Sequence, residues 1–361
     1  MQHSKDRILT THVGSLPRPQ WVRDLIEDRK NGSVSWRDAD ALLDSAVPAA
    51  IAMQERAGLD YVSDGEWRRE SYVKVFADAI GGFGYDLHTE EAGIKVSSLP
   101  YPAVVGKLSA DRPIAVDEAR FLKANANKKV IVAIPSPYTI GRRMWTAEHS
   151  RGAYATREEF IDACIPIVRD EVARLTAEGV DAVQLDDPWL ALLVDESYRE
   201  RENITDVDHE MELSVKSVNA VVEGATVPVS VHLCHAHFNR KHGTKGPYDL
   251  IMGALGQMNA DRFAIELATP DAGGIEALAR FPSDKLLGLG IIDHTDKHVE
   301  TPEEVVARAE AAMQYVAPDK ITLNPDCGFA PGNAADIPID EAYAKLCNEA
   351  KAAAILRERH G

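Results

Sequence analysis

The stretch VPVSVHLC, residues 227–234, is a short apolar run rich in valine. Its length is too small for a typical helix, and its β-branched residues favour a buried strand. Seven further runs of similar length recur along the chain between amphipathic stretches. They are ILTTHV (8–13), DYVSDG (60–65), KVIVAIPS (129–136), DAVQLDD (181–187), RFAIELA (262–268), KLLGLGII (285–292) and KITLNPD (320–326).

Helical patterns separate these runs. The clearest cover 37–57, 156–178, 302–316 and 339–358, and weaker ones cover 206–223, 247–258 and 273–281. Strands that alternate with helices form parallel sheets. Eight such units predict an α/β fold, a single (β/α)8 TIM barrel over residues 1–361. A doubly wound open sheet is the alternative, but no G-x-G-x-x-G follows the first run, which disfavours a dinucleotide-binding version.

Residues 67–128 interrupt the alternation between the second and third strands. This stretch includes GGFGYDL and YPAVVGKLSADRP, which are typical of loops or a small hairpin. We predict an insertion within the barrel that forms a lid or wall of the site. The segment HFNRKHGTKGPYD, residues 237–249, is predicted to be a mobile loop after the fifth strand.

Composition excludes some classes of function. The chain has 361 residues, of which 45% are hydrophobic, and a formal net charge of −17. An acidic balance argues against nucleic acid or an anionic membrane as a partner. No apolar run is long enough to span a bilayer, and the first residues lack a secretory signal, so we expect a cytoplasmic protein. Four cysteines in so long a chain argue against a disulfide framework, and Cys164 and Cys347 are expected in helices.

Polar side chains end most of the predicted strands, and in a parallel barrel these ends converge on one face. The set contains histidine, cysteine and glutamate, which are zinc ligands. By spacing alone, a structural zinc, or two core cysteines beside a polar histidine, remains an alternative. The principal strand-end residues are His12, Gly14, Ser15, Asp64, Glu66, Asp186, Asp187, His232, Cys234, His235, His237, Glu266, Asp293, His294, Asn324, Asp326 and Cys327.

Six stretches that contain most of these residues together resemble the catalytic domain of cobalamin-independent methionine synthase and its short relatives. The short relatives include the epoxyalkane–coenzyme M transferases. The six stretches occur in the family's order along nearly the whole chain. They are THVGSLPRP (11–19), GLDYVSDGE (58–66), VDAVQLDDP (180–188), VHLC (231–234), AIEL (264–267) and LNPDCG (323–328).

The resemblance implies a role for each site residue. Zinc would be held by His232, Cys234, Glu266 and Cys327, with Glu266 the ligand that an incoming thiol displaces. Gly14 and Ser15 would hold a substrate carboxylate, and Glu66 and Asp186 an ammonium group. Asp293 and His294 would form a proton-donating pair, although the register at IIDHTD is one residue tighter than the family's. Alternatively, His294 is a hydrogen-bonded structural histidine, and the acids of DGE and LDDP belong to turns.

The chain also departs from the synthase pattern. The third strand ends in Pro135, Ser136, Pro137 and Tyr138, where the synthases have a tryptophan that stacks on the pterin. The methyl donor therefore stays open between methyltetrahydrofolate, a methylated corrinoid protein and a small methylated compound. Three arginines are candidates for binding an anionic substrate, with exposed surface positions as the alternative: Arg18, Arg68 and Arg69.

We therefore expect zinc-dependent methyl or alkyl transfer to a thiol, with homocysteine as the acceptor and methionine as the product. One rival keeps the zinc chemistry but uses another thiol or electrophile, as in epoxide opening or demethylation. A second is a metal-dependent hydrolase using His232, His235, His237 and Asp293. A third is a non-catalytic metal-binding barrel. The sequence does not indicate an oligomeric state.

Overall fold

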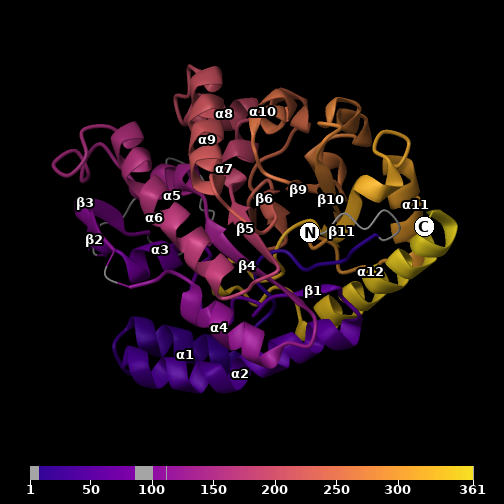
Figure 1. Ribbon diagram of the computed structural model, residues 1–361, viewed down its shortest axis with the longest axis horizontal. Coiled ribbons are helices and arrows are strands. Elements are labelled where there is room, and N and C mark those ends of the chain that lie inside the picture. Colours follow the sequence, from indigo (N-terminus) through magenta and orange to yellow (C-terminus); the bar gives the residue numbers. More distant parts are fainter. Residues whose placement is uncertain (1–7, 86–100, 111, 361) are drawn as a thin grey trace.

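The computed structural model describes residues 8–85, 101–110 and 112–360. Seven parallel strands form a curled central sheet in the order β1-β4-β5-β6-β9-β10-β11, with helices around it (Figure 1). The strands are β1 Tyr61–Val62, β4 Lys129–Pro135, β5 Ala182–Asp186, β6 Val229–Leu233, β9 Arg262–Glu266, β10 Leu286–Ile292 and β11 Ile321–Pro325. A short hairpin of β7 His237–Phe238 and β8 Lys241–His242 lies between β6 and β9 in the chain, at the start of the segment predicted to be a loop.

The sheet closes through two residues of the first predicted strand. Thr10 forms a parallel bridge with Leu323 of β11, and Thr11 forms one with Tyr61 of β1. The outer strands β1 and β11 therefore both pair with the segment that contains Thr10 and Thr11, which closes the sheet. The predicted barrel is confirmed. The prediction of full strands at 8–13 and 60–65 is wrong, because Gly14 (φ +63) and Gly65 (φ +67) turn the chain out of extended geometry soon after these pairings.

The helices surround the sheet (Figure 1). The α-helices are α1 Gln20–Lys30, α2 Trp36–Ala57, α3 Lys74–Ala79, α4 Val116–Asn125, α5 Pro137–Met144, α6 Arg157–Ala177, α7 Pro188–Leu192, α8 Glu196–Arg201, α9 Val207–Val222, α10 Met252–Gln257, α11 Pro302–Ala312 and α12 Ile339–His360. The 3₁₀ turns are η1 Tyr248–Leu250, η2 Pro270–Ala272, η3 Ile275–Arg280, η4 Pro318–Lys320 and η5 Pro331–Asn333.

Local sequence signals explain where the long helices begin. The Ser35 hydroxyl accepts a hydrogen bond from the Asp38 amide at the start of α2, and Thr156 does the same for Glu159 at the start of α6. A capping box between Thr301 and Glu304 opens α11. The four clearest helical predictions are therefore confirmed, although α11 ends four residues early. The predicted helix at 273–281 is instead the 3₁₀ turn η3.

A polar layer fills part of the barrel interior. Arg262 is almost fully buried and donates to the hydroxyls of Thr322 (2.8 Å) and Ser230 (3.0 Å) and to the side-chain oxygen of Asn324. A Cβ on Gly288 would lie 2.3 Å from the Arg262 guanidinium, so only glycine leaves room for it. A separate apolar cluster contains the first residues of β1, β5 and β10, which are Tyr61, Ala182 and Leu286, together with Leu9 and Ile131.

The stretch between β1 and β4 contains α3, an antiparallel pair of strands and α4. The pair consists of β2 Gly81–Gly84 and β3 Ala103–Ser109, with Phe83 opposite Val104. It lies beside α3, at the left of Figure 1. Residues 86–100 and 111 of the predicted insertion lie outside the described residues. In the described part of the chain, no helix combines the length and apolar character that crossing a membrane requires.

Candidate metal and substrate site

One pocket at the carboxyl ends of the strands collects seven of the ten predicted site residues. Two belong to the loop after Thr11, one follows β1, one ends β5, two lie at the end of β6 and one follows β11. These residues are Gly14, Ser15, Glu66, Asp186, His232, Cys234 and Cys327. The other three, Glu266, Asp293 and His294, are buried or half-buried behind this wall and are not part of its lining.

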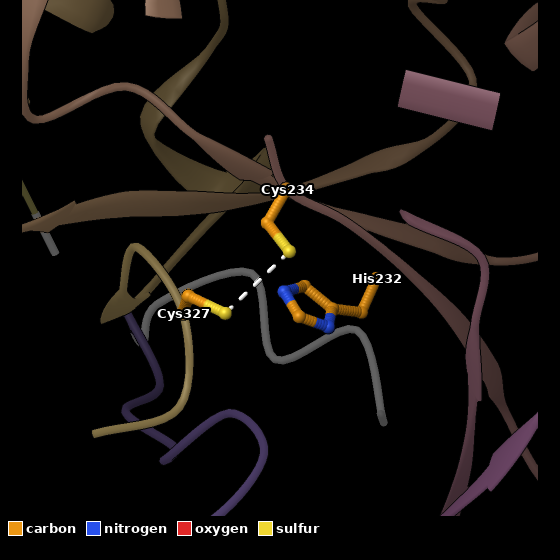
Figure 2. A group of neighbouring side chains, drawn as sticks. All are labelled: His232, Cys234 and Cys327. Atoms are coloured by element: carbon orange, nitrogen blue, oxygen red, sulfur yellow. Dashed lines mark hydrogen bonds between the residues drawn. The ribbon is translucent and has the colours of Figure 1, made fainter. Parts of the chain in front are cut away.

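His232, Cys234 and Cys327 form a compact group, which we call the thiol group (Figure 2). The two sulfurs lie 3.5 Å apart, and all three residues are at least nine-tenths buried. Two sulfurs bound to one zinc at about 2.3 Å, in tetrahedral geometry, would lie about 3.8 Å apart. The Nδ1 atom of His232 is 3.2 Å from Asp186 Oδ1, while its buried Nε2 has no hydrogen-bond partner. The residues present therefore fit a zinc ion.

The side chains of the thiol group shift one another's pKa values. Hydrogen bonding from Cys327 holds the pKa of Cys234 well below its usual range, and nearby His232 lowers it further. The pKa of the Cys327 thiol is raised by the same hydrogen bond and by burial. Burial alone would lower the pKa of His232, but Cys234 and Asp186 outweigh it and raise that pKa to about 10. Thiolate character, the form that binds a metal, is therefore favoured at Cys234, whose thiolate accepts the hydrogen bond from the Cys327 thiol.

Two buried carboxylates in the pocket wall each have an unpartnered oxygen. They are Oε1 of Glu66, which is 5% exposed, and Oδ2 of Asp186, which is 2% exposed. Arg69 Nη1 is 3.7 Å from Glu66, yet burial still raises the pKa of this carboxyl to about 7. A buried acceptor without a donor is costly. The pair is therefore suited to a cationic ligand.

The loop with Gly14 and Ser15 crosses closely over the loop after β11. A Cβ on Gly328 would lie 2.6 Å from the Ser15 amide nitrogen, so this approach requires glycine. The Ser15 carbonyl accepts hydrogen bonds from the amides of Phe329 (2.8 Å) and Ala330 (3.2 Å). These contacts fix the Gly14–Ser15 turn beside Cys327.

Arg18 stabilises the loops around the pocket and is not placed to bind an anion. Its guanidinium donates to the carbonyls of Ala330 (3.1 Å), Glu66 (2.7 Å) and Arg69 (3.0 Å). Arg69 bonds Glu118, and Arg68 bonds Asp44. All three arginines are buried, so the alternative that they are exposed surface residues is wrong.

Glu266 lies in a different group from the two cysteines. Its Oε2 accepts hydrogen bonds from the His235 amide (3.0 Å) and from His237 Nε2 (2.8 Å). Its Oε1 lies 2.7 Å from His242 Nδ1. His237 in turn contacts the Cys234 thiol, so it joins the two groups.

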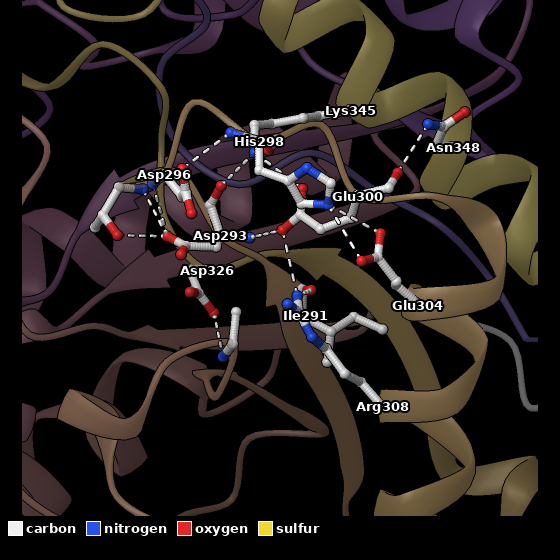
Figure 3. Close-up of polar contacts among 12 residues, drawn as sticks. Ile291, Asp293, Asp296, His298, Glu300, Glu304, Arg308, Asp326, Lys345 and Asn348 are labelled. Atoms are coloured by element: carbon white, nitrogen blue, oxygen red, sulfur yellow. Dashed lines mark hydrogen bonds and ion pairs between the residues drawn. The ribbon is translucent and has the colours of Figure 1, made fainter.

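Asp293 lies in a turn after β10 that a buried lysine anchors (Figure 3), and His294 follows it in the chain. Lys345 of α12 donates to the Asp293 carbonyl (2.7 Å), to Glu300 Oε2 (2.9 Å) and to the His298 carbonyl. The Asp293 side chain accepts from the Thr295 amide and hydroxyl, each at 2.6 Å. Asp293 therefore stabilises the turn.

His294 is 2% exposed, and neither of its ring nitrogens has a hydrogen-bond partner. Its ring lies edge-on to that of His237, with centroids 3.8 Å apart. Burial lowers the pKa of His294 well below its usual value, so the imidazole is neutral near pH 7. His294 thus does not line the pocket itself but contacts His237, which does.

Some pocket residues were missed from the sequence. Trp189, directly after the LDDP motif, lines the pocket with Tyr72 and Tyr101, and Arg143 stacks on Tyr101 (3.7 Å) and on Trp189 (4.6 Å). The tryptophan after LDDP was a signal that could have been used, because aromatic rings commonly line ligand pockets. His235 bonds Tyr248 and the Gly246 carbonyl and is not part of the thiol group, which does not favour the hydrolase arrangement.

Comparisons with known proteins show the family to which the chain belongs. The family model "Cobalamin-independent synthase, Catalytic domain" matches residues 8–354. The chain is 29% identical to the methionine synthase of Sulfurisphaera tokodaii over 97% of this chain and 92% of that protein. It is 28% identical to that of Saccharolobus solfataricus, over 97% and 95% of the two chains.

Solved structures share the fold. The B12-independent methionine synthase from Shewanella sp. W3-18-1, in complex with selenomethionine, superposes with a TM-score of 0.81 at 22% identity, over 98% of each chain. A putative vitamin-B12-independent methionine synthase from Listeria monocytogenes gives a TM-score of 0.72 at 20% identity, over 96% of this chain and 98% of that one. With the family model matching nearly the whole chain, this protein belongs to the cobalamin-independent synthase catalytic-domain family.

Proposed function

We propose that this protein transfers a methyl group to the sulfur of homocysteine, in a zinc-dependent reaction that gives methionine. The observation that carries the proposal is the composition of one pocket. Its wall contains the thiol group, two buried carboxylates that each have one oxygen without a hydrogen bond, and the Gly14–Ser15 turn. A thiol, an ammonium and a carboxylate are the three polar groups of homocysteine. The names of the relatives support the same reading.

Each part of the pocket has a separate task. Glu66 and Asp186 accept hydrogen bonds from the ammonium group, which offsets their buried charge. The Gly14–Ser15 turn receives the carboxylate. His232, Cys234 and Cys327 are the proposed protein ligands of zinc, which when bound lowers the pKa of the incoming thiol and orients its thiolate. Glu266 is the proposed fourth protein ligand, which the incoming thiol would displace, and His237 and His242 are placed to receive its carboxylate.

In the proposed reaction the sulfur loses its proton and forms a bond to the methyl carbon. The bond between that carbon and the donor breaks, and the leaving group takes its electron pair and then a proton. Asp293 and His294 are the proposed proton-donating pair. His294 does not line the pocket; it packs edge-on against His237, which does, and its ring nitrogens form no hydrogen bond with that ring. Tyr72, Tyr101 and Trp189 form the apolar wall against which the donor lies.

The test is a turnover assay with metal-free protein, with and without added zinc. Homocysteine is paired in turn with methyltetrahydrofolate, a methylated corrinoid and a small methylsulfonium compound, and methionine is measured. We expect zinc-dependent methionine with at least one donor and none from Cys327→Ser. The matched control is Cys164→Ser, because Cys164 is buried in α6 outside the pocket. Absence of zinc-dependent methionine with every donor contradicts the proposal.

A further inference from the structure

Two hydrogen-bond donors in the pocket wall lack an acceptor. They are the indole Nε1–H of Trp189 and the phenol hydroxyl of Tyr72; both atoms are buried, and neither has a hydrogen-bond partner in the described structure. Trp189 is 2% exposed. Buried polar atoms without partners are rare in folded proteins. Two of them in the wall of one pocket indicate that a ligand supplies the acceptor. We call these two residues the donor pair.

The chain anchors Trp189 through Asp187, the second acid of the LDDP motif. The Asp187 carboxylate accepts hydrogen bonds from three hydroxyl groups, and its amide donates to the His232 carbonyl at 3.0 Å. The three hydroxyls belong to Ser136 (2.8 Å), Thr139 (2.8 Å) and Ser214 (2.6 Å). Trp189 follows in the first turn of α7, so its backbone is fixed beside the end of β6.

Arg143, in the last turn of α5, contacts two rings of the pocket wall. Its guanidinium carbon lies 4.6 Å from the ring centre of Trp189 and 3.7 Å from that of Tyr101. Contacts between a cation and an aromatic face at such distances are attractive. The Tyr101 hydroxyl lies 3.4 Å from that of Ser71, the residue before Tyr72. These contacts hold the donor pair in position before a ligand binds.

The Tyr72 hydroxyl can donate a hydrogen bond but cannot act as a base near neutral pH. Burial raises the pKa of Tyr72 well above its usual range; Arg143 opposes this rise, and the nearby charges of Cys234 and Asp186 add to it. The hydroxyl therefore keeps its proton. The indole of Trp189 has a donor and no acceptor. Both members of the donor pair thus suit an acceptor atom, whereas the two carboxylates of the same pocket suit a cation.

We propose that the donor pair, Trp189 and Tyr72, binds the methyl donor and selects one that carries a nitrogen or oxygen acceptor. This inference rests on the proposed function for the identity of the reaction. Methyltetrahydrofolate and methylcobalamin both carry such acceptors, and the trimethylsulfonium ion carries none. When the bond between the donor and its methyl carbon breaks, the leaving group keeps the electron pair. Hydrogen bonds from the donor pair strengthen as electron density builds up on the leaving group, which lowers the barrier.

Calorimetric titration of the zinc-loaded protein with three methyl donors, without homocysteine, tests the inference. The probes are methyltetrahydrofolate, methylcobalamin and trimethylsulfonium, and we expect wild type to bind at least one of the first two. Tyr72→Phe and Trp189→Phe each keep an aromatic ring and remove one hydrogen bond, so each is expected to weaken that binding about threefold to tenfold. Trimethylsulfonium has no acceptor, so its affinity is expected to be the same in wild type and both variants.

The matched control is Trp145→Phe, because the Trp145 indole donates to the Tyr154 carbonyl and does not line the pocket. It is expected to bind the probes with wild-type affinity. Methionine binding is measured with the same variants and is expected to change by less than about twofold, which separates a lost contact with the methyl donor from a damaged pocket.

Three results overturn the inference: no binding of methyltetrahydrofolate or methylcobalamin by wild type, undiminished binding of both in the two variants, or an equal loss for all three probes. Methionine formation together with any of these results overturns only this inference. Selective weakening of an acceptor-bearing donor in the variants, without methionine formation by wild type, supports the inference and contradicts only the proposed function.

Discussion

Under the proposed function, Glu66 distinguishes an amino-acid thiol from a thiol without an ammonium group. Its carboxylate is 5% exposed and one oxygen has no hydrogen-bond partner, so a bound ammonium group would be its first full donor. Glu66→Gln keeps the shape and removes the charge. A hydrogen bond between charged groups in such a site contributes about 1.5–3 kcal/mol. At about 1.4 kcal/mol per tenfold change, the loss corresponds to roughly 10–100-fold in kcat/KM.

The assay compares homocysteine with sulfanylbutyrate, which has the same thiol and carboxylate but no amino group. It is run near pH 8, because the pKa of Glu66 is about 7 and the carboxyl is then mostly ionised. Glu66→Gln is expected to lower kcat/KM for homocysteine by the full factor, and that for sulfanylbutyrate by less than about threefold. Glu70→Gln is the matched control, since Glu70 pairs with Lys74 outside the pocket. An equal loss with both thiols would refute ammonium recognition by Glu66.

Two further predictions use groups that the structure places in unusual surroundings. Burial raises the pKa of Glu66 to about 7, and a bound ammonium group lowers it again, so methionine binding near pH 6.5 releases a proton. Calorimetry in buffers of different ionisation enthalpy measures this release, which Glu66→Gln is expected to abolish; proton uptake by wild type would contradict it. Lys345→Met removes one of the two cationic partners of the buried Glu300 carboxylate, the other being Arg308, and is expected to lower the free energy of unfolding by about 1–3 kcal/mol. Urea denaturation measures it, with the surface substitution Lys351→Met on the same helix as the control; equal stability of the two variants would show that the buried pair contributes nothing.

The apolar runs predicted most of the sheet because their side chains carry the signal for burial. β4, β5, β6, β9, β10 and β11 all lie within predicted runs. The first run is extended only briefly: Thr10 meets Leu323, the Asp60 carboxylate accepts from the Thr10 amide at 3.0 Å, and the chain turns at Gly14 soon afterwards. A run with only two bridged residues has the same apolar composition as a full strand, so its sequence does not distinguish the two.

The residue types of the site could be predicted from the sequence, but not all of the contacts between those residues. Strand ends converge in a barrel, so the order of the runs was enough to bring His232, Cys234 and Cys327 together. The separation of Glu266 from them depends on the hairpin that carries His237 and His242. That hairpin has Asn-Arg in its turn instead of the Asn-Gly or Asp-Gly that marks such turns in a sequence. His242 therefore appeared to be part of a loop.

The central claim is that the thiol group holds a zinc ion that binds the substrate's sulfur. Zinc-edge X-ray absorption of the protein loaded with one equivalent of zinc tests it most directly, with homocysteine withheld and then added. The account predicts two sulfur ligands without homocysteine and three with it. An unchanged count of two sulfurs would show that the thiol does not bind the zinc, and zinc without any sulfur ligand would contradict the assignment of Cys234 and Cys327.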